Sequence, residues 1–87
     1  MNPALLSVRV MVEDVWDEIH LDIAPSTPLG DLKAMALYEA GVTFPPDDYL
    51  LKFRGAELED EDRSVADAGV VANATLIVLP RRRRPLR

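Results

Sequence analysis

Charged side chains are the residues of this 87-residue chain that could most readily do chemistry. Five arginines in the last seven positions could contact nucleic acid or an anionic membrane surface. They are Arg81, Arg82, Arg83, Arg84 and Arg87. An acidic run could bind calcium, but it lacks the spaced oxygen ligands and central glycine of a calcium loop, so a solvated loop is favoured. Its members are Glu57, Glu59, Asp60, Glu61 and Asp62.

Several kinds of site are excluded by residue counts. The chain has no cysteine, which excludes disulfides, thiolate metal sites and thiol nucleophiles. It has a single histidine, His20, which excludes a zinc site made of a histidine pair. No serine or second histidine is placed to act with His20, so we expect it to be a surface residue of a strand. No glycine loop for phosphate and no nucleophile paired with a base is present. The sequence therefore predicts no enzymatic activity, no cofactor, no metal and no small-molecule substrate.

The net charge of −5 is the sum of two unlike parts. Residues 1–80 hold all fifteen acidic and five basic side chains and carry −10, whereas residues 81–87 carry +5. An acidic body would repel a polyanion, and no aromatic residues accompany the arginines, so nucleic-acid or membrane contact by the tail is an alternative only. The tail could equally contact an acidic protein, fold back on the chain's own acidic loops, or have no specific role. We predict one domain over 1–80 and a basic Arg/Pro tail over 81–87.

Membrane and export signals are missing from the sequence as given. No apolar run approaches the ~20 residues that span a bilayer. The segment from Met1 to Val12 contains Arg9 and no small-residue cleavage site, so it is not typical of a signal peptide. We expect a cytoplasmic protein.

The elements that position these residues can be predicted from hydrophobic spacing. Alternation at Val8, Val10 and Val12, a polar break, and a second alternating run over 19–23 predict an antiparallel hairpin. Thr27 followed by Pro28 predicts an N-cap and first helical residue. Apolar residues at helical spacing then predict a helix over 29–40. The apolar positions are Leu29, Leu32, Ala36 and Ala40, flanked by Met35 and Leu37. Gly41 would end the helix. Gly30 lies within it and should lower its stability slightly, because glycine has a low helix propensity.

The second half of the chain is predicted to form short strands and turns. Residues 45–48 are predicted as loop, 49–54 as a strand ended by Gly55, and 57–59 as a short extended piece. Residues 64–69 suit one helical turn capped by Ser64, and 75–79 form a β run stopped by Pro80. This order predicts a mixed sheet packed on one helix, an α+β architecture.

Six motifs in this order resemble ubiquitin and the ubiquitin-like β-grasp proteins over about residues 7–80. The motifs are Leu21-Asp22-Ile23-Ala24-Pro25-Ser26, the helix positions Leu29, Leu32, Lys33 and Ala36 ending at Gly41, Pro45-Pro46-Asp47, Leu51-Lys52-Phe53-Arg54-Gly55 with Leu58-Glu59-Asp60, Arg63-Ser64-Val65-Ala66-Asp67 with Val70, and Thr75-Leu76-Ile77-Val78-Leu79. The resemblance implies a mixed sheet of four to five strands on one helix, with Lys33 buried.

The chain departs from this family in its tail. Conjugating members end in two glycines, which thread narrow enzyme channels because they have no side chain. Residues 80–87 contain no glycine, two prolines and five arginines. The sequence therefore predicts a non-conjugating member, similar to bacterial ubiquitin-like proteins without the diglycine end. A processed covalent modifier or sulfur carrier remains the alternative.

Strand alternation predicts an apolar surface on the face of the sheet that points away from the helix. We expect Met11, Leu50, Ile77 and Leu79 there, with Lys52 and Arg9 among them. Family members commonly bind partners through this face, so the resemblance implies a protein-binding patch. A register shifted by one residue would reverse these assignments, and the tail or a second copy could cover the patch.

Trp16 near the hairpin turn is a candidate interaction anchor, because tryptophan is enriched at binding hot spots. The alternative is that it packs over the sheet edge. Lys52 lies where ubiquitin's own patch has an isoleucine, which favours a dedicated partner with an acid opposite this lysine. The sequence as a whole predicts a monomeric or weakly associating adaptor or accessory subunit that binds another protein without covalent attachment.

Overall fold

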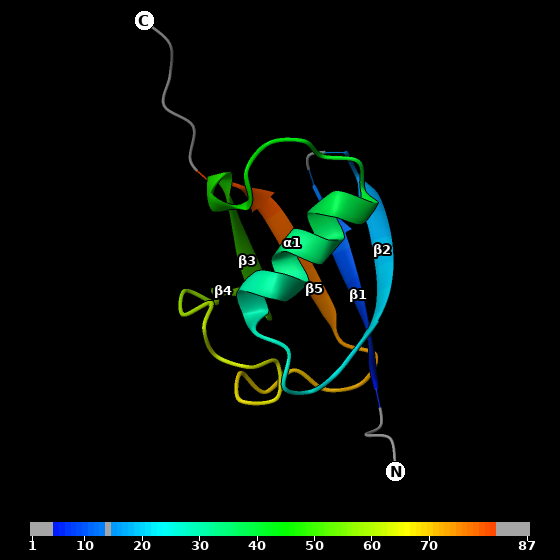
Figure 1. Cartoon of the computed structure of the whole chain (residues 1–87), viewed down its shortest axis with the longest axis vertical. Coiled ribbons are helices and arrows are strands. Elements are labelled where there is room, and N and C mark those ends of the chain that lie inside the picture. Colours follow the sequence, from blue (N-terminus) through cyan, green and yellow to red (C-terminus); the bar gives the residue numbers. More distant parts are fainter. Residues whose placement is uncertain (1–4, 14, 82–87) are drawn as a thin grey trace, which may run out of the picture.

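The computed structural model describes residues 5–13 and 15–81, which form one mixed sheet with a helix across one face (Figure 1). The elements are β1 (Leu6–Val12), β2 (Asp17–Ile23), α1 (Leu29–Glu39), the 3₁₀ turn η1 (Pro46–Asp48), β3 (Tyr49–Phe53), β4 (Ala56–Glu57) and β5 (Thr75–Pro80). The strand order is β2-β1-β5-β3-β4, with β1 and β5 parallel in the centre and the other pairs antiparallel. The predicted α+β architecture is therefore confirmed.

The core lies between the sheet and α1, and strand alternation determines which side chains enter it. Val8, Val10 and Val12 of β1 and Leu76 and Val78 of β5 are at most 1% exposed. The helix contributes four side chains that are each at most 2% exposed: Leu29, Leu32, Ala36 and Leu37. Because successive strand residues point to opposite faces, burial of these residues directs their neighbours to the face opposite the helix. We call that surface the outer sheet face.

The helix begins one residue later than the Thr27 cap predicts. Pro28 is the N-cap residue, in extended conformation, and no side chain caps the helix. The first free N–H groups are instead satisfied by the loop before β5: Leu29 N donates to Arg63 O and Gly30 N to Glu61 O, each at 2.9 Å. Thr27 is held elsewhere, since its carbonyl accepts from Val65 N at 2.8 Å. A tertiary backbone contact has therefore replaced the local cap.

Gly30, predicted as a mild cost to the helix, allows this close approach. A Cβ at this position would lie 3.3 Å from Glu61 Cβ and 3.4 Å from Glu61 Oε1. The first distance is tighter than ordinary van der Waals contact, so Glu61 would have to shift by a few tenths of an ångström to admit a side chain here. The glycine thus has a packing role that sequence alone does not show.

Gly41 follows the helix with φ +79°, the left-handed region that glycine adopts without a steric penalty. A Cβ there would meet no atom within 4 Å, so backbone strain alone determines the effect of a substitution. We expect Gly41→Ala to lower the free energy of unfolding by ~1 kcal/mol. Urea denaturation measures it, and an unchanged or raised midpoint would contradict the assigned C-terminal conformation.

The other turns predicted from the sequence lie close to their positions in the structure. Ser64 Oγ accepts from Asp67 N at 3.0 Å, as the predicted cap requires. Pro46–Asp48, predicted as loop, forms one 3₁₀ turn, because Asp48 N donates to Pro45 O at 2.9 Å. Pro80 extends β5 by pairing with Tyr49 in register.

Candidate protein-interaction surface

Three strands bring the predicted patch residues together on the outer sheet face. Met11 of β1 lies in register with Ile77 of β5, which lies in register with Lys52 of β3. In the next row, Leu79 of β5 pairs with Leu50 of β3. Directly opposed residues on one face have Cβ atoms ~5 Å apart, so these side chains form two adjoining rows.

All five patch side chains are partly exposed. Met11, Leu50, Lys52, Ile77 and Leu79 are each of intermediate burial, whereas their strand neighbours point into the core. The register is therefore the one that strand alternation predicts, without the one-residue shift. The arrangement gives an apolar surface over the central strands with one lysine in it.

Trp16 lies in the turn between β1 and β2, outside the two rows. Its side chain is 75% exposed, and its neighbour Val15 is 46% exposed. The alternative that Trp16 packs over the sheet edge is therefore wrong. Trp16 also has a φ of +52°, a backbone conformation uncommon for a large side chain.

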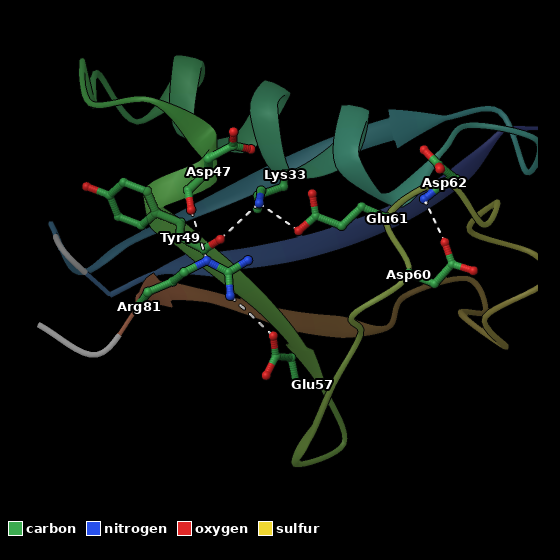
Figure 2. A network of polar contacts seen from close by, with 8 residues as sticks. All are labelled: Lys33, Asp47, Tyr49, Glu57, Asp60, Glu61, Asp62 and Arg81. Atoms are coloured by element: carbon green, nitrogen blue, oxygen red, sulfur yellow. Dashed lines mark hydrogen bonds and ion pairs between the residues drawn. The ribbon is translucent and has the colours of Figure 1, made fainter.

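The first tail arginine is fixed to the body of the domain. Arg81 N donates to Asp48 O at 2.8 Å, and its Nε donates to Asp47 O at 2.9 Å. Its Nη1 lies 3.5 Å from Glu57 Oε2 (Figure 2). Arg81 thus folds back on acidic segments, one of the alternatives for the tail, while Arg82, Arg83, Arg84 and Arg87 lie outside the described residues.

A buried cation lies close to this contact. Lys33 of α1 is 1% exposed, and its Nζ donates to Tyr49 O at 2.9 Å and to Glu61 Oε2 at 2.6 Å (Figure 2). The carbonyls of residues 47, 48 and 49 are therefore held in succession by Arg81 and Lys33. Glu61 belongs to the acidic run predicted as a solvated loop, and this prediction is wrong for Glu61, since its carboxylate neutralises the buried ammonium.

Arg9 of the internal strand β1 is exposed on the outer sheet face in register with Thr75, whereas the remaining charged strand residues other than Lys52 belong to the edge strands β2 and β4. His20 is exposed on β2, as predicted, with Nε2 3.7 Å from Glu18 Oε1. Ser7 Oγ donates to Asp22 Oδ1 at 2.5 Å. Within residues 5–13 and 15–81, no three histidine, cysteine or acidic side chains are grouped to hold a metal ion. No helix in the same residues is long and apolar enough to cross a membrane.

A second exposed apolar area lies on the helix side of the molecule, and it was not predicted from the sequence. Tyr38 is 80% exposed and Met35 36% exposed, and together with Leu21 of β2 they line a shallow hollow. Phe44, in the segment after α1, is 63% exposed. Helical spacing could have located Tyr38, because it lies opposite the buried stripe of α1.

Known proteins share this architecture at low sequence identity. No family model and no curated protein matches the sequence. Among solved structures, a Caldiarchaeum subterraneum ubiquitin aligns with TM-score 0.76 and 17% identity over 93% of this chain and 99% of its own. The ubiquitin-like domain of an Arabidopsis thaliana protein aligns with TM-score 0.76 and 15% identity, over 97% of this chain and 85% of its own. A protein designed from ubiquitin gives TM-score 0.78 and 19% identity, over 99% and 100%. The chain has the ubiquitin-like β-grasp fold.

The predicted fold is thus confirmed, and the arrangement of the patch can be placed in it. In this β-grasp domain the apolar rows cross the parallel pair β1–β5 and the adjoining strand β3, on the face opposite α1. The Trp16 turn and the Arg81 contact lie outside those rows. What the fold supports directly is a ubiquitin-like module, and the choice of a binding face depends on the exposed side chains.

Proposed function

We propose that the domain is a non-covalent protein-interaction module that binds a partner through its outer sheet face. The observation that carries the proposal is the two registered rows of partly exposed apolar side chains, Met11–Ile77 and Leu79–Leu50, with Lys52 beside them. Contiguous exposed apolar surface on a small domain is typical of protein-binding sites. The role is that of an adaptor or accessory subunit, without a catalytic step.

Trp16 is proposed as a secondary anchor at the edge of this surface. Its large exposed side chain would bury considerable apolar area in a partner pocket. Its left-handed backbone is maintained at some energetic cost, which is more often found at functional positions than elsewhere. The tail from Arg82 onward has no assigned part in this proposal.

A charge reversal in the centre of the face tests the proposal. We expect Lys52→Glu to reduce partner capture by at least ~10-fold, because a carboxylate buried at an apolar contact without a matching cation is costly. The measurement is quantitative affinity purification from cells that produce the protein. Arg63→Glu is the matched control, since it makes the same charge change in the loop beside the helix start. Equal capture by wild type and Lys52→Glu would refute the proposed face.

A further inference from the structure

The single tryptophan of the chain lies in the turn between β1 and β2. Val12 and Asp17 pair in register at the base of this turn, and Trp16 N donates to Glu13 O at 3.2 Å. Glu13 N donates to Val78 O at 2.9 Å, which joins the turn to the end of β5. Trp16 itself is 75% exposed. The domain therefore presents one large apolar side chain to solvent from a turn that is anchored to the sheet.

Carboxylates follow the tryptophan on both faces of the sheet. Asp17 is in register with Val12, whose side chain points into the core, so Asp17 lies toward the helix side. Glu18 is in register with Met11 and lies on the outer sheet face. Both acids are exposed, and Glu13 at the start of the turn is half-buried. The described residues of this turn thus hold three acidic side chains and no lysine or arginine.

The domain does little to neutralise this negative charge. Within residues 5–13 and 15–81, Glu13 and Asp17 have neither an ion pair nor a side-chain hydrogen bond. Glu18 Oε1 lies 3.7 Å from Nε2 of the exposed His20, a contact that is an ion pair only when the imidazole is protonated. A partner that covers the indole of Trp16 must therefore also supply positive charge.

We propose that the Trp16 turn binds an arginine-rich segment of the partner protein, with one guanidinium stacked on the indole and others paired with Asp17 and Glu18. This inference rests on the proposed function, in which Trp16 is an anchor, and names the chemistry that the anchor recognises. The face of an indole attracts cations more strongly than other aromatic rings do. A guanidinium is planar, so it stacks on the ring and also donates two parallel hydrogen bonds to a carboxylate.

An arginine-rich segment fits this turn better than the other surfaces that take up a tryptophan. An anionic membrane or a nucleic acid would repel the carboxylates of Glu13, Asp17 and Glu18. An uncharged apolar pocket would desolvate these carboxylates at its rim without pairing them, which is costly. Only a basic segment supplies both the contact with the indole and the counter-charges.

The test uses the full chain, in which all tryptophan fluorescence comes from this turn. Three short peptides share a glycine–serine framework and carry arginine, lysine or glutamate as their only charged residues. The arginine peptide should change the emission of Trp16 saturably and bind at least ~3-fold more tightly than the lysine peptide, because only a guanidinium stacks on the indole. The glutamate peptide should leave the emission unchanged.

Two variants and a control assign the binding to this turn. Asp17→Asn should weaken binding of the arginine peptide by ~3-fold or more, because one charge-assisted contact is lost. Glu59→Gln removes the same charge from an exposed position in a distant loop and should leave the affinity unchanged. Trp16→Leu, measured by isothermal titration calorimetry, should abolish the preference for arginine over lysine. The basic tail is the same in every variant, so it does not alter these comparisons.

The outcomes separate this inference from the proposed function. Equal affinities for the arginine and lysine peptides, no saturable response, or an equal loss in Glu59→Gln would overturn the arginine-rich segment. So would an emission change produced by phosphatidylserine vesicles alone, which would assign the turn to a membrane, or by raising the protein concentration alone, which would assign it to a second copy. Ile77→Asp should leave binding of the arginine peptide unchanged. If the peptides fail while Ile77→Asp still abolishes partner capture, the arginine-rich segment is wrong and the outer sheet face remains the binding site.

Discussion

Replacing Glu61 with alanine is expected to lower the free energy of unfolding by about 2–3 kcal/mol, a large effect for a domain of this size. The reason is the ammonium of Lys33, which is 1% exposed and 2.6 Å from Glu61 Oε2. Removing the carboxylate leaves a buried cation with only the carbonyl of Tyr49 as a partner. The side chain of Glu61 is itself 26% exposed, so the estimate lies below the 3–5 kcal/mol typical of a fully buried pair.

Two further variants make this prediction specific. Glu59→Ala removes a carboxylate from the same loop at an exposed position and should change stability by less than ~0.5 kcal/mol. Lys33→Met replaces the ammonium by an apolar group of similar volume and should cost less than Glu61→Ala, because no buried charge is left unpaired. Urea denaturation of all three variants measures the order of their free energies of unfolding. Equal effects of Glu61→Ala and Glu59→Ala would show that the Lys33 pair does not contribute to stability.

The strands and their faces could be predicted from the sequence because their signal is local. Alternation at Val8, Val10 and Val12 gives both the strand and the buried side, and Leu76 and Val78 do the same for β5. Once those faces are assigned, Met11 and Ile77 must point outward. The outward-facing residues follow from this period-two pattern, whereas their arrangement in two rows depends on the pairing of β5 with β1 and β3, which are distant in sequence.

Features that depend on contacts distant in sequence could not be predicted in the same way. The helix start is set by carbonyls of Glu61 and Arg63, more than thirty residues later. A local rule instead assigned the cap to Thr27. Glu61 is one of five acids in a run and nothing in its local sequence distinguishes it from Glu59. Only the folded chain shows that one of them reaches Lys33.

The Trp16 turn and the tail illustrate the same limit. The sequence favours a tryptophan packed over the sheet edge, but Trp16 is 75% exposed because its exposure depends on where the hairpin turn points. Arg81 is one of five tail arginines, but its position directly after β5 brings it to the η1 carbonyls. The sheet register, which places Pro80 opposite Tyr49, is what brings them together.

Ile77→Asp is expected to produce the largest loss of partner binding, at least ~30-fold, which corresponds to the ~2 kcal/mol of a hot-spot residue. Ile77 lies in the middle of the outer sheet face, between Met11 and Lys52 in register. A carboxylate there removes apolar contact area and adds a charge that the partner must desolvate. The effect on folding should be smaller, ~1 kcal/mol, because the side chain points away from the core and aspartate is only a poor strand former.

A control on the opposite side of the molecule is available in the same chain. Tyr38 of α1 is 80% exposed and belongs to the apolar area on the helix side. Tyr38→Asp introduces the same charge at an exposed apolar surface on the helix side, away from the outer sheet face. The heteronuclear NMR spectrum of each variant establishes that the sheet is retained before binding is compared.

The most direct measurement is quantitative affinity purification with wild type, Ile77→Asp and Tyr38→Asp in parallel, from cells that produce the protein. Binding through the outer sheet face predicts a set of partners that is retained by Tyr38→Asp and lost by Ile77→Asp. Partners that are retained by folded Ile77→Asp, or lost only with Tyr38→Asp, would contradict the proposed binding face.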